Sequence, residues 1–90
     1  MAPAAHIVYN GDVQRVGFRY TARRLAGSHD VAGYVRNLPD GTVELLVQGE
    51  EAEVKDYLQA LEGRLGHHIR DRRLDWREPD NSLAGFAVRF

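Results

Sequence analysis

The order in which helix-like and strand-like apolar patterns follow one another constrains the fold of this chain more than any other feature of the sequence. Apolar residues recur at helical spacing in two stretches, from residue 18 to about 29 and from 50 to about 65. Shorter β-prone runs precede, separate and follow these stretches, at residues 6–10, 31–38, 42–48, 69–77 and 83–90. The order β-α-β-β-α-β, with an extra C-terminal strand, predicts an α+β ferredoxin-like sandwich. In that fold two helices cover one face of an antiparallel sheet.

Two local features add detail to this topology. The run at 69–77 carries charges on most of its residues, which is typical of a strand with an exposed face or a strand at the edge of a sheet. Residues 39–41 read Pro-Asp-Gly, a turn sequence in which proline presets its own φ and glycine accepts a positive φ. We therefore expect a tight turn between the strands at 31–38 and 42–48.

Length and charge exclude several classes of protein. Ninety residues are enough for one small domain, which we place at 6–90 after a short N-terminal tail at 1–5. A formal net charge of −1 gives no general attraction to nucleic acid or to an anionic membrane. The sequence has no cysteine, no apolar run long enough to span a bilayer and no evident signal peptide. We expect a cytoplasmic monomer without a nucleic-acid or membrane partner.

The junction between the first strand and the first helix has the composition of an anion-binding loop. Residues 11–19 read Gly-Asp-Val-Gln-Arg-Val-Gly-Phe-Arg, and two glycines flank the loop. A strand–loop–helix junction directs several backbone N–H groups at one point, beside the positive end of the helix dipole. Arg19 adds a planar guanidinium that matches two oxygens of a phosphate. The junction therefore predicts a site for a small anion, most simply a phosphoryl group.

The topology predicts that Asn37 lies near this junction. In a split β-α-β unit the first and second strands are parallel, and the third strand lies between them. A helix of about 12 residues spans ~18 Å, and a strand of about 6 residues spans ~20 Å. Because these lengths match, the end of the second strand returns to the level of the anion loop. Asn37 occupies that end.

These residues also resemble a known family. The usual acylphosphatase signature is Gly-x-Val-Gln-Gly-Val-x-Phe-Arg, which residues 11–19 match except at one position. A second family-like block occupies residues 33–44, and residues 85–90 resemble the family's closing strand, so the resemblance extends from about residue 7 to 90. It implies the same ferredoxin-like fold. It also implies hydrolysis of an acyl phosphate to a carboxylate and inorganic phosphate, without a metal or another cofactor.

The resemblance implies a role for each residue of the site. Arg19 would bind the substrate phosphate, and Asn37 would position the attacking water. Backbone amides of the loop would complete the phosphate cradle, and they belong to Gln14, Arg15, Val16, Gly17 and Phe18.

Arg15 is the position at which the sequence departs from the family pattern, which has glycine there. Glycine in such a loop supplies a positive φ or a close backbone approach, and a side chain costs ~1–2 kcal/mol where φ is positive. If the loop has relaxed, the domain is a catalytically weak module that binds phosphate or a protein partner. If the Arg15 side chain points outward, the cradle and the activity survive. A ferredoxin-like RNA-binding or regulatory domain is a third alternative, disfavoured by the near-neutral charge and the lack of paired aromatics on a central strand.

Other residues have simpler structural explanations. Val13, Val16 and Phe18 are expected to anchor the loop in the core. Arg36 is expected to cover the sheet surface or to meet a carboxylate. The adjacent histidines at 67 and 68 lack acidic or cysteine partners at ligand spacing, so a solvated pair is favoured over a metal site.

Overall fold

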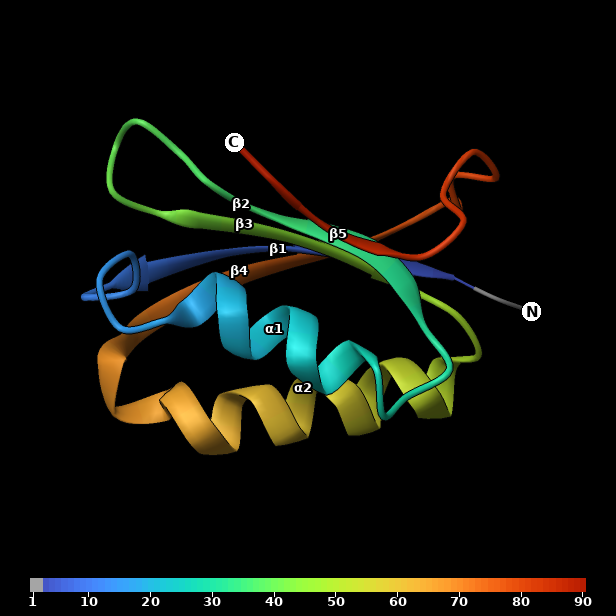
Figure 1. Ribbon diagram of the computed structural model, residues 1–90, viewed down its shortest axis with the longest axis horizontal. Helices are drawn as coiled ribbons and strands as arrows, with labels where there is room; N and C mark the ends of the chain where they lie inside the picture. The colour runs from blue at the N-terminus through green and yellow to red at the C-terminus, as the bar shows by residue number, and fades with distance from the viewer. Residues whose placement is uncertain (1–2) are drawn as a thin grey trace.

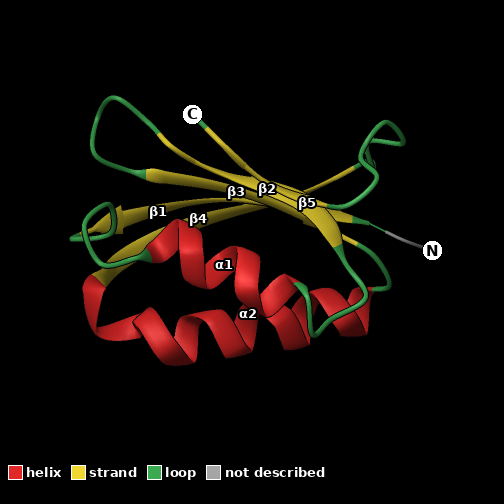
Figure 2. Cartoon of the chain, viewed as in Figure 1, coloured by secondary structure: helices red, strands yellow, loops and turns green. Residues whose placement is uncertain are grey.

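A computed structural model of the chain describes residues 3–90 and shows a two-layer sandwich (Figure 1). Within residues 3–90, both α-helices lie on the same face of one sheet, and the other face carries no helix (Figure 2). None of the helices in residues 3–90 is long and apolar enough to cross a membrane. The elements, in chain order, are β1 (Ala4–Gly11), α1 (Phe18–Ala26), β2 (Ala32–Asn37), β3 (Val43–Gln48), α2 (Glu51–Leu65), a short 3-10 helix (Gly66–His68), β4 (Ile69–Arg77) and β5 (Phe86–Arg89).

The sheet has the strand order β4-β1-β3-β2-β5, so the ferredoxin-like arrangement is confirmed and the charged strand β4 lies at an edge. The first four strands in this order pair antiparallel, as expected. The fifth strand, β5, pairs parallel with β2 and makes the sheet mixed. The reason is the connection after β4: the chain crosses to the opposite edge and reverses direction, and that direction is the one in which β2 runs.

The N-terminal boundary differs from the sequence-based prediction. We expect a tail at residues 1–5, but β1 begins at Ala4, and Ala4 and Ala5 are fully buried opposite Gln48 and Val47 of β3. Alanine has a weak preference for strands, so the sequence pattern does not indicate that these two residues join the sheet. Residues 1 and 2 of the expected tail lie outside the described residues.

The core lies between the sheet and the two helices. Alternate residues of the central strands face the helices, and the Tyr57 hydroxyl of α2 donates a 2.7 Å hydrogen bond to the carbonyl of Ala22 in α1, which ties the helices together. The largest fully buried side chains are Tyr9, Tyr57, Phe18, Ile7, Leu45, Leu61, Val13, Val35, Val43, Val47 and Val54. This layer fixes where α1 begins, and therefore where the loop before it lies.

Candidate functional site

The loop between β1 and α1 begins at a bulge that requires glycine. Gly11 has φ +139°, and a Cβ built there would lie 2.3 Å from the carbonyl oxygen of His68. The pairing of β1 with β4 shifts register at this point, and the next amide, that of Asp12, donates to the same His68 oxygen at 3.0 Å. The bulge ends the strand and turns the chain toward the helix.

The loop ends at a second glycine, which starts the helix. Gly17 has φ +74° and ψ 27° and occupies the N-cap position of α1. The first helical hydrogen bond runs from the Thr21 amide to the Gly17 carbonyl, at 2.9 Å. The N–H groups of residues 18–20 therefore have no acceptor within the helix, and they point out of its N-terminus beside the positive end of the dipole.

The side chain of Gln14 fixes the loop to the turn between β2 and β3. Its Nε2 donates to the carbonyl oxygens of Leu38 and Thr42, at 2.7 and 2.8 Å. The sequence reasoning considered only the backbone amide of Gln14 and missed this clamp. No pattern indicates it, because the two carbonyls lie 24 and 28 residues further along the chain.

The turn that receives Gln14 is itself well braced. The Gly41 amide donates to the Leu38 carbonyl at 3.1 Å, which closes the turn predicted from Pro39-Asp40-Gly41. Both the hydroxyl and the amide of Thr42 donate to Asp40 Oδ1, at 2.6 and 3.0 Å. These hydrogen bonds, the hydroxyl's most of all, lower the pKa of the Asp40 carboxyl. A rigid turn gives the anion loop a fixed support.

Arg15 adopts an ordinary backbone conformation. No residue other than glycine has a positive φ in residues 3–90. The Arg15 side chain is exposed, and it does not line the cleft described below. The loop therefore accommodates arginine without the strain that the family's glycine pattern suggests, and the outward orientation is the alternative that the structure favours.

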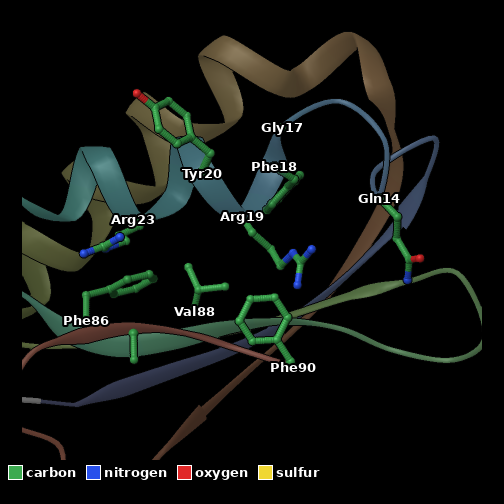
Figure 3. Close-up of a pocket in the computed structure, with 10 residues that line it drawn as sticks. Gln14, Gly17, Phe18, Arg19, Tyr20, Arg23, Phe86, Val88 and Phe90 are labelled. Carbon is green, nitrogen blue, oxygen red and sulfur yellow. The ribbon is translucent and has the colours of Figure 1, made fainter.

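Arg19 lines a cleft of about 680 Å³ between the start of α1 and strand β5 (Figure 3). Its guanidinium lies over the ring of Phe90, with 4.8 Å between Cζ and the ring centroid. None of the ion pairs formed within residues 3–90 involves Arg19. The Phe90 ring thus positions the guanidinium without neutralising its positive charge, so the guanidinium is available to bind an anion. From the predicted loop, Gln14, Gly17 and Phe18 also line this cleft.

Asn37 is the last residue of β2 and carries an unpaired buried atom. Its Oδ1 is buried and has no hydrogen-bond partner within the part of the chain that the structure describes. Asn37 lies opposite Val43 of β3, and Tyr9, near the end of β1, lies opposite the same Val43 from the other side. The two strand ends are therefore level, as the helix and strand lengths predict.

Arg19 and Asn37 do not share a single cleft. Asn37 lines a smaller hollow of about 390 Å³ beside the cleft of Arg19, and Phe90 borders both. The sequence reasoning did not identify Phe90 as part of the site. The signal was present, because Phe86, Val88 and Phe90 alternate along the last strand and so share the face that points toward α1.

The other residues considered from the sequence have structural roles. Val13 and Phe18 are buried, and Val16 packs against the core. The guanidinium of Arg36 lies 2.8 Å from Glu44, as expected for a residue that meets a carboxylate. Residues 67 and 68 belong to no group of three potential metal-ligating side chains within the described residues.

A cluster on the open face of the sheet lies outside the site. His6 Nε2 donates to Glu44 Oε2 at 2.8 Å, and the Tyr34 hydroxyl donates to the same oxygen at 3.3 Å. Burial alone would raise the pKa of Glu44, but the hydrogen bond from His6 and the charge of Arg36 outweigh it and lower that pKa. The cluster joins β1, β2 and β3.

Comparison with known proteins decides the family. The family model described as Acylphosphatase matches residues 5–88. The chain belongs to the acylphosphatase family. An acylphosphatase from Thermococcus kodakarensis is 40% identical over 85 residues, which cover 93% of this chain and 92% of that protein. The resemblance read from residues 11–19 and 33–44 is thus confirmed.

Solved acylphosphatase structures show the same fold. The crystal structure of an acylphosphatase from Bacillus subtilis matches with a TM-score of 0.86 and 26% identity, covering 98% of this chain and 99% of that one. T. kodakarensis HypF matches with a TM-score of 0.83 and 30% identity, but this chain spans only 12% of it. Family and fold together support acyl phosphate hydrolysis as the reaction of this chain.

Proposed function

We propose that this chain hydrolyses acyl phosphates with a phosphate cradle made of Arg19 and the loop at residues 14–18, and with Asn37 positioning the attacking water. The observation that carries the proposal is the Arg19 guanidinium: it lines a cleft at the N-terminus of α1 and is held by a ring rather than by a carboxylate. The proposed substrate is a small-molecule acyl phosphate, and no metal or other cofactor takes part.

The phosphate end of the substrate is bound by two kinds of donor. The free N–H groups at the start of α1 and the amides of the loop favour a negative charge through both hydrogen bonding and the helix dipole. Arg19 adds a guanidinium with parallel donors. Phosphoryl transfer passes through a loose transition state whose charge spreads over three equatorial oxygens, so such a cradle stabilises the transition state directly.

The attacking water is held at the end of β2. We propose that the Asn37 carboxamide, which lines the smaller hollow, holds the water by a hydrogen bond and so aims an oxygen lone pair at phosphorus from the side opposite the leaving carboxylate. Phe90 borders both hollows, so the proposed water position lies next to the cleft that holds the phosphate.

The chemistry needs no further acid or base from the protein. A carboxylate is a good leaving group and departs without protonation. A phosphate oxygen of the substrate accepts the proton of the water. We therefore expect a pH–rate profile with a broad plateau. A sharp bell with a limb in the histidine range would contradict this step.

Hydrolysis of a simple aryl acyl phosphate tests the proposal. We expect turnover that is insensitive to a chelator and that falls by about 10²–10³ in the Arg19→Ala variant, because a preorganised charge-stabilising donor is removed. The geometry of Arg15 does not support the alternative of a catalytically weak phosphate- or partner-binding module. A folded parent protein with no more turnover than Arg19→Ala would favour that module instead.

We propose further that this domain works as a cytoplasmic monomer without a nucleic-acid partner. The net charge of −1 supports this, since it gives no general attraction to polyanions. The many charged residues of β4 also support a monomer, because charged edge strands disfavour pairing with a second sheet.

A further inference from the structure

We propose that the cleft beside Arg19 is an acyl subsite in which Arg23 selects substrates that carry a second anionic group at the far end of a short acyl chain. The inference rests on the proposed function, because it takes the phosphate to lie at the Arg19 end of the cleft. It adds a specificity-determining residue and names a substrate class, the monophosphorylated dicarboxylic acids of about four or five carbons.

The cleft continues from the phosphate site along one side of α1. Arg19 and Arg23 both line it, and they lie four residues apart on the same face of the helix. Four residues advance about 6 Å along a helix, so the two side chains are neighbours on one stripe. Figure 3 shows both side chains on the α1 side of the cleft, with Arg19 toward Phe90 and Arg23 toward Phe86.

The opposite wall of the cleft is apolar. Phe86 and Val88 of β5, with Phe90 directly after it, face the two arginines (Figure 3). Phe86 and Val88 are partly buried against the core, and Phe90 is almost fully exposed. A short methylene chain fits such a wall, and the wall contributes no charge to balance the arginines.

The charge of Arg23 is also uncompensated. None of the ion pairs formed within residues 3–90 involves Arg23. The neighbouring Arg24 also forms no ion pair within residues 3–90, but it does not line the cleft, and its Nη1 donates to the Tyr20 hydroxyl at 3.4 Å. Neither Arg19 nor Arg23 pairs with a carboxylate of residues 3–90, and two such arginines at the two ends of one apolar wall match a ligand with an anion at each end.

The spacing sets the length of the ligand. With the phosphate at Arg19, a second anion at Arg23 lies about one helical turn away. The extended chain of a four- or five-carbon diacid separates its two ends by a similar length. In this proposal Arg23 contacts a part of the substrate that does not change during the reaction. Arg23 should therefore lower KM for the diacid substrates and have little effect on kcat.

Succinyl phosphate and its methyl ester test the proposal, since the ester removes the charge at the far end and adds only a methyl group. We expect the parent protein to prefer succinyl phosphate in kcat/KM by about threefold to fivefold at low salt, the range of an exposed ion pair. The preference should arise in KM and should fall toward one at high salt. In Arg23→Gln the preference should disappear, and in Arg23→Glu it should reverse.

Arg24→Gln and Arg24→Glu are the matched controls, because they change the overall charge equally at a neighbouring exposed position outside the cleft. They should keep the parent's preference. Equal kcat/KM for the two substrates in the parent, or a preference that survives Arg23→Gln, would overturn the subsite and leave the proposed function standing. Failure of the parent to hydrolyse either substrate would overturn the proposed function and the subsite with it.

Discussion

At the scale of single residues, the side chain of Gln14 holds the loop in place. Gln14 lies in the anion loop, yet its side chain reaches two carbonyls of the β2–β3 turn. Arg15 is exposed. The loop conformation is therefore set by its two glycines and by the Gln14 clamp, and the side chain at position 15 is free to vary.

Arg15→Gly tests whether the departure from the family signature matters. We expect catalytic turnover close to that of the parent, because Arg15 has no positive φ that glycine would relieve. We also expect a loss of about 0.4–1 kcal/mol in the free energy of unfolding, since glycine gives the unfolded chain more conformational freedom. Turnover assays and urea denaturation measure both. A clear rise in turnover would show that the arginine strains the loop.

At the scale of elements, the site depends on the point at which β1 stops. The bulge at Gly11 ends the pairing with β4 and allows the Asp12 amide to reach His68. The loop then spans the gap to α1, and the turn at residues 38–42 supports it through the Gln14 side chain. Displacement of this junction would move every amide of the cradle.

Gly11→Ala tests that dependence. A Cβ there would lie 2.3 Å from the His68 carbonyl oxygen and 2.7 Å from the Arg70 amide nitrogen, at a backbone φ that alanine disfavours. We expect the free energy of unfolding to fall by more than about 2 kcal/mol, because a clash with backbone adds to the cost of the positive φ. Chemical denaturation measures the change.

Gly63→Ala provides the matched control for Gly11→Ala. Gly63 lies within α2, is exposed, and has nothing within 4 Å of the added Cβ. The same substitution there should stabilise the protein by about 0.5–1 kcal/mol, since alanine favours a helix interior over glycine. Equal effects at the two positions would contradict the role given to the bulge.

At the scale of the whole molecule, the open face of the sheet contributes a pH-dependent part of the stability. The pKa of Glu44 is lowered in the folded protein. A carboxyl of this kind stabilises the fold above its unfolded pKa, near 4.5, and this stabilisation is lost as the pH falls through the lower folded pKa.

Glu44→Gln should therefore reduce stability at neutral pH and have a smaller effect in acid. We expect the difference in unfolding free energy between the parent and Glu44→Gln to shrink as the pH falls below about 4.5, the usual value for the carboxyl. Urea denaturation across this pH range measures it. Glu51→Gln is the control, because Glu51 pairs with Lys55 on an exposed helix face, where such pairs contribute little. If the difference in unfolding free energy between the parent and Glu44→Gln stayed constant across this pH range, the proposed contribution of the Glu44 carboxylate to stability would be contradicted.

The sequence predicted what depends on local pattern and on topology. The element order and the alignment of Asn37 with the end of β1 follow from periodicity and element lengths, whereas the charges of β4 left an exposed face and an edge position as alternatives. The pairing of His6 with Glu44 could not be predicted, because it depends on a diagonal register between strands 38 residues apart. The φ of Arg15 could not be predicted from the sequence either. The glycine that the family has at this position suggests a positive φ, but Arg15 has a negative one.

The most direct test of the proposed site separates phosphate binding from water positioning. Binding of inorganic phosphate, measured by calorimetry, and turnover of an aryl acyl phosphate should be compared in the parent, Arg19→Ala and Asn37→Ala proteins. We expect Arg19→Ala to lose both, and Asn37→Ala to bind phosphate like the parent while its turnover falls by about 10² or more. Parent-like phosphate binding by Arg19→Ala, or near-normal turnover by Asn37→Ala, would contradict the roles proposed for these two residues.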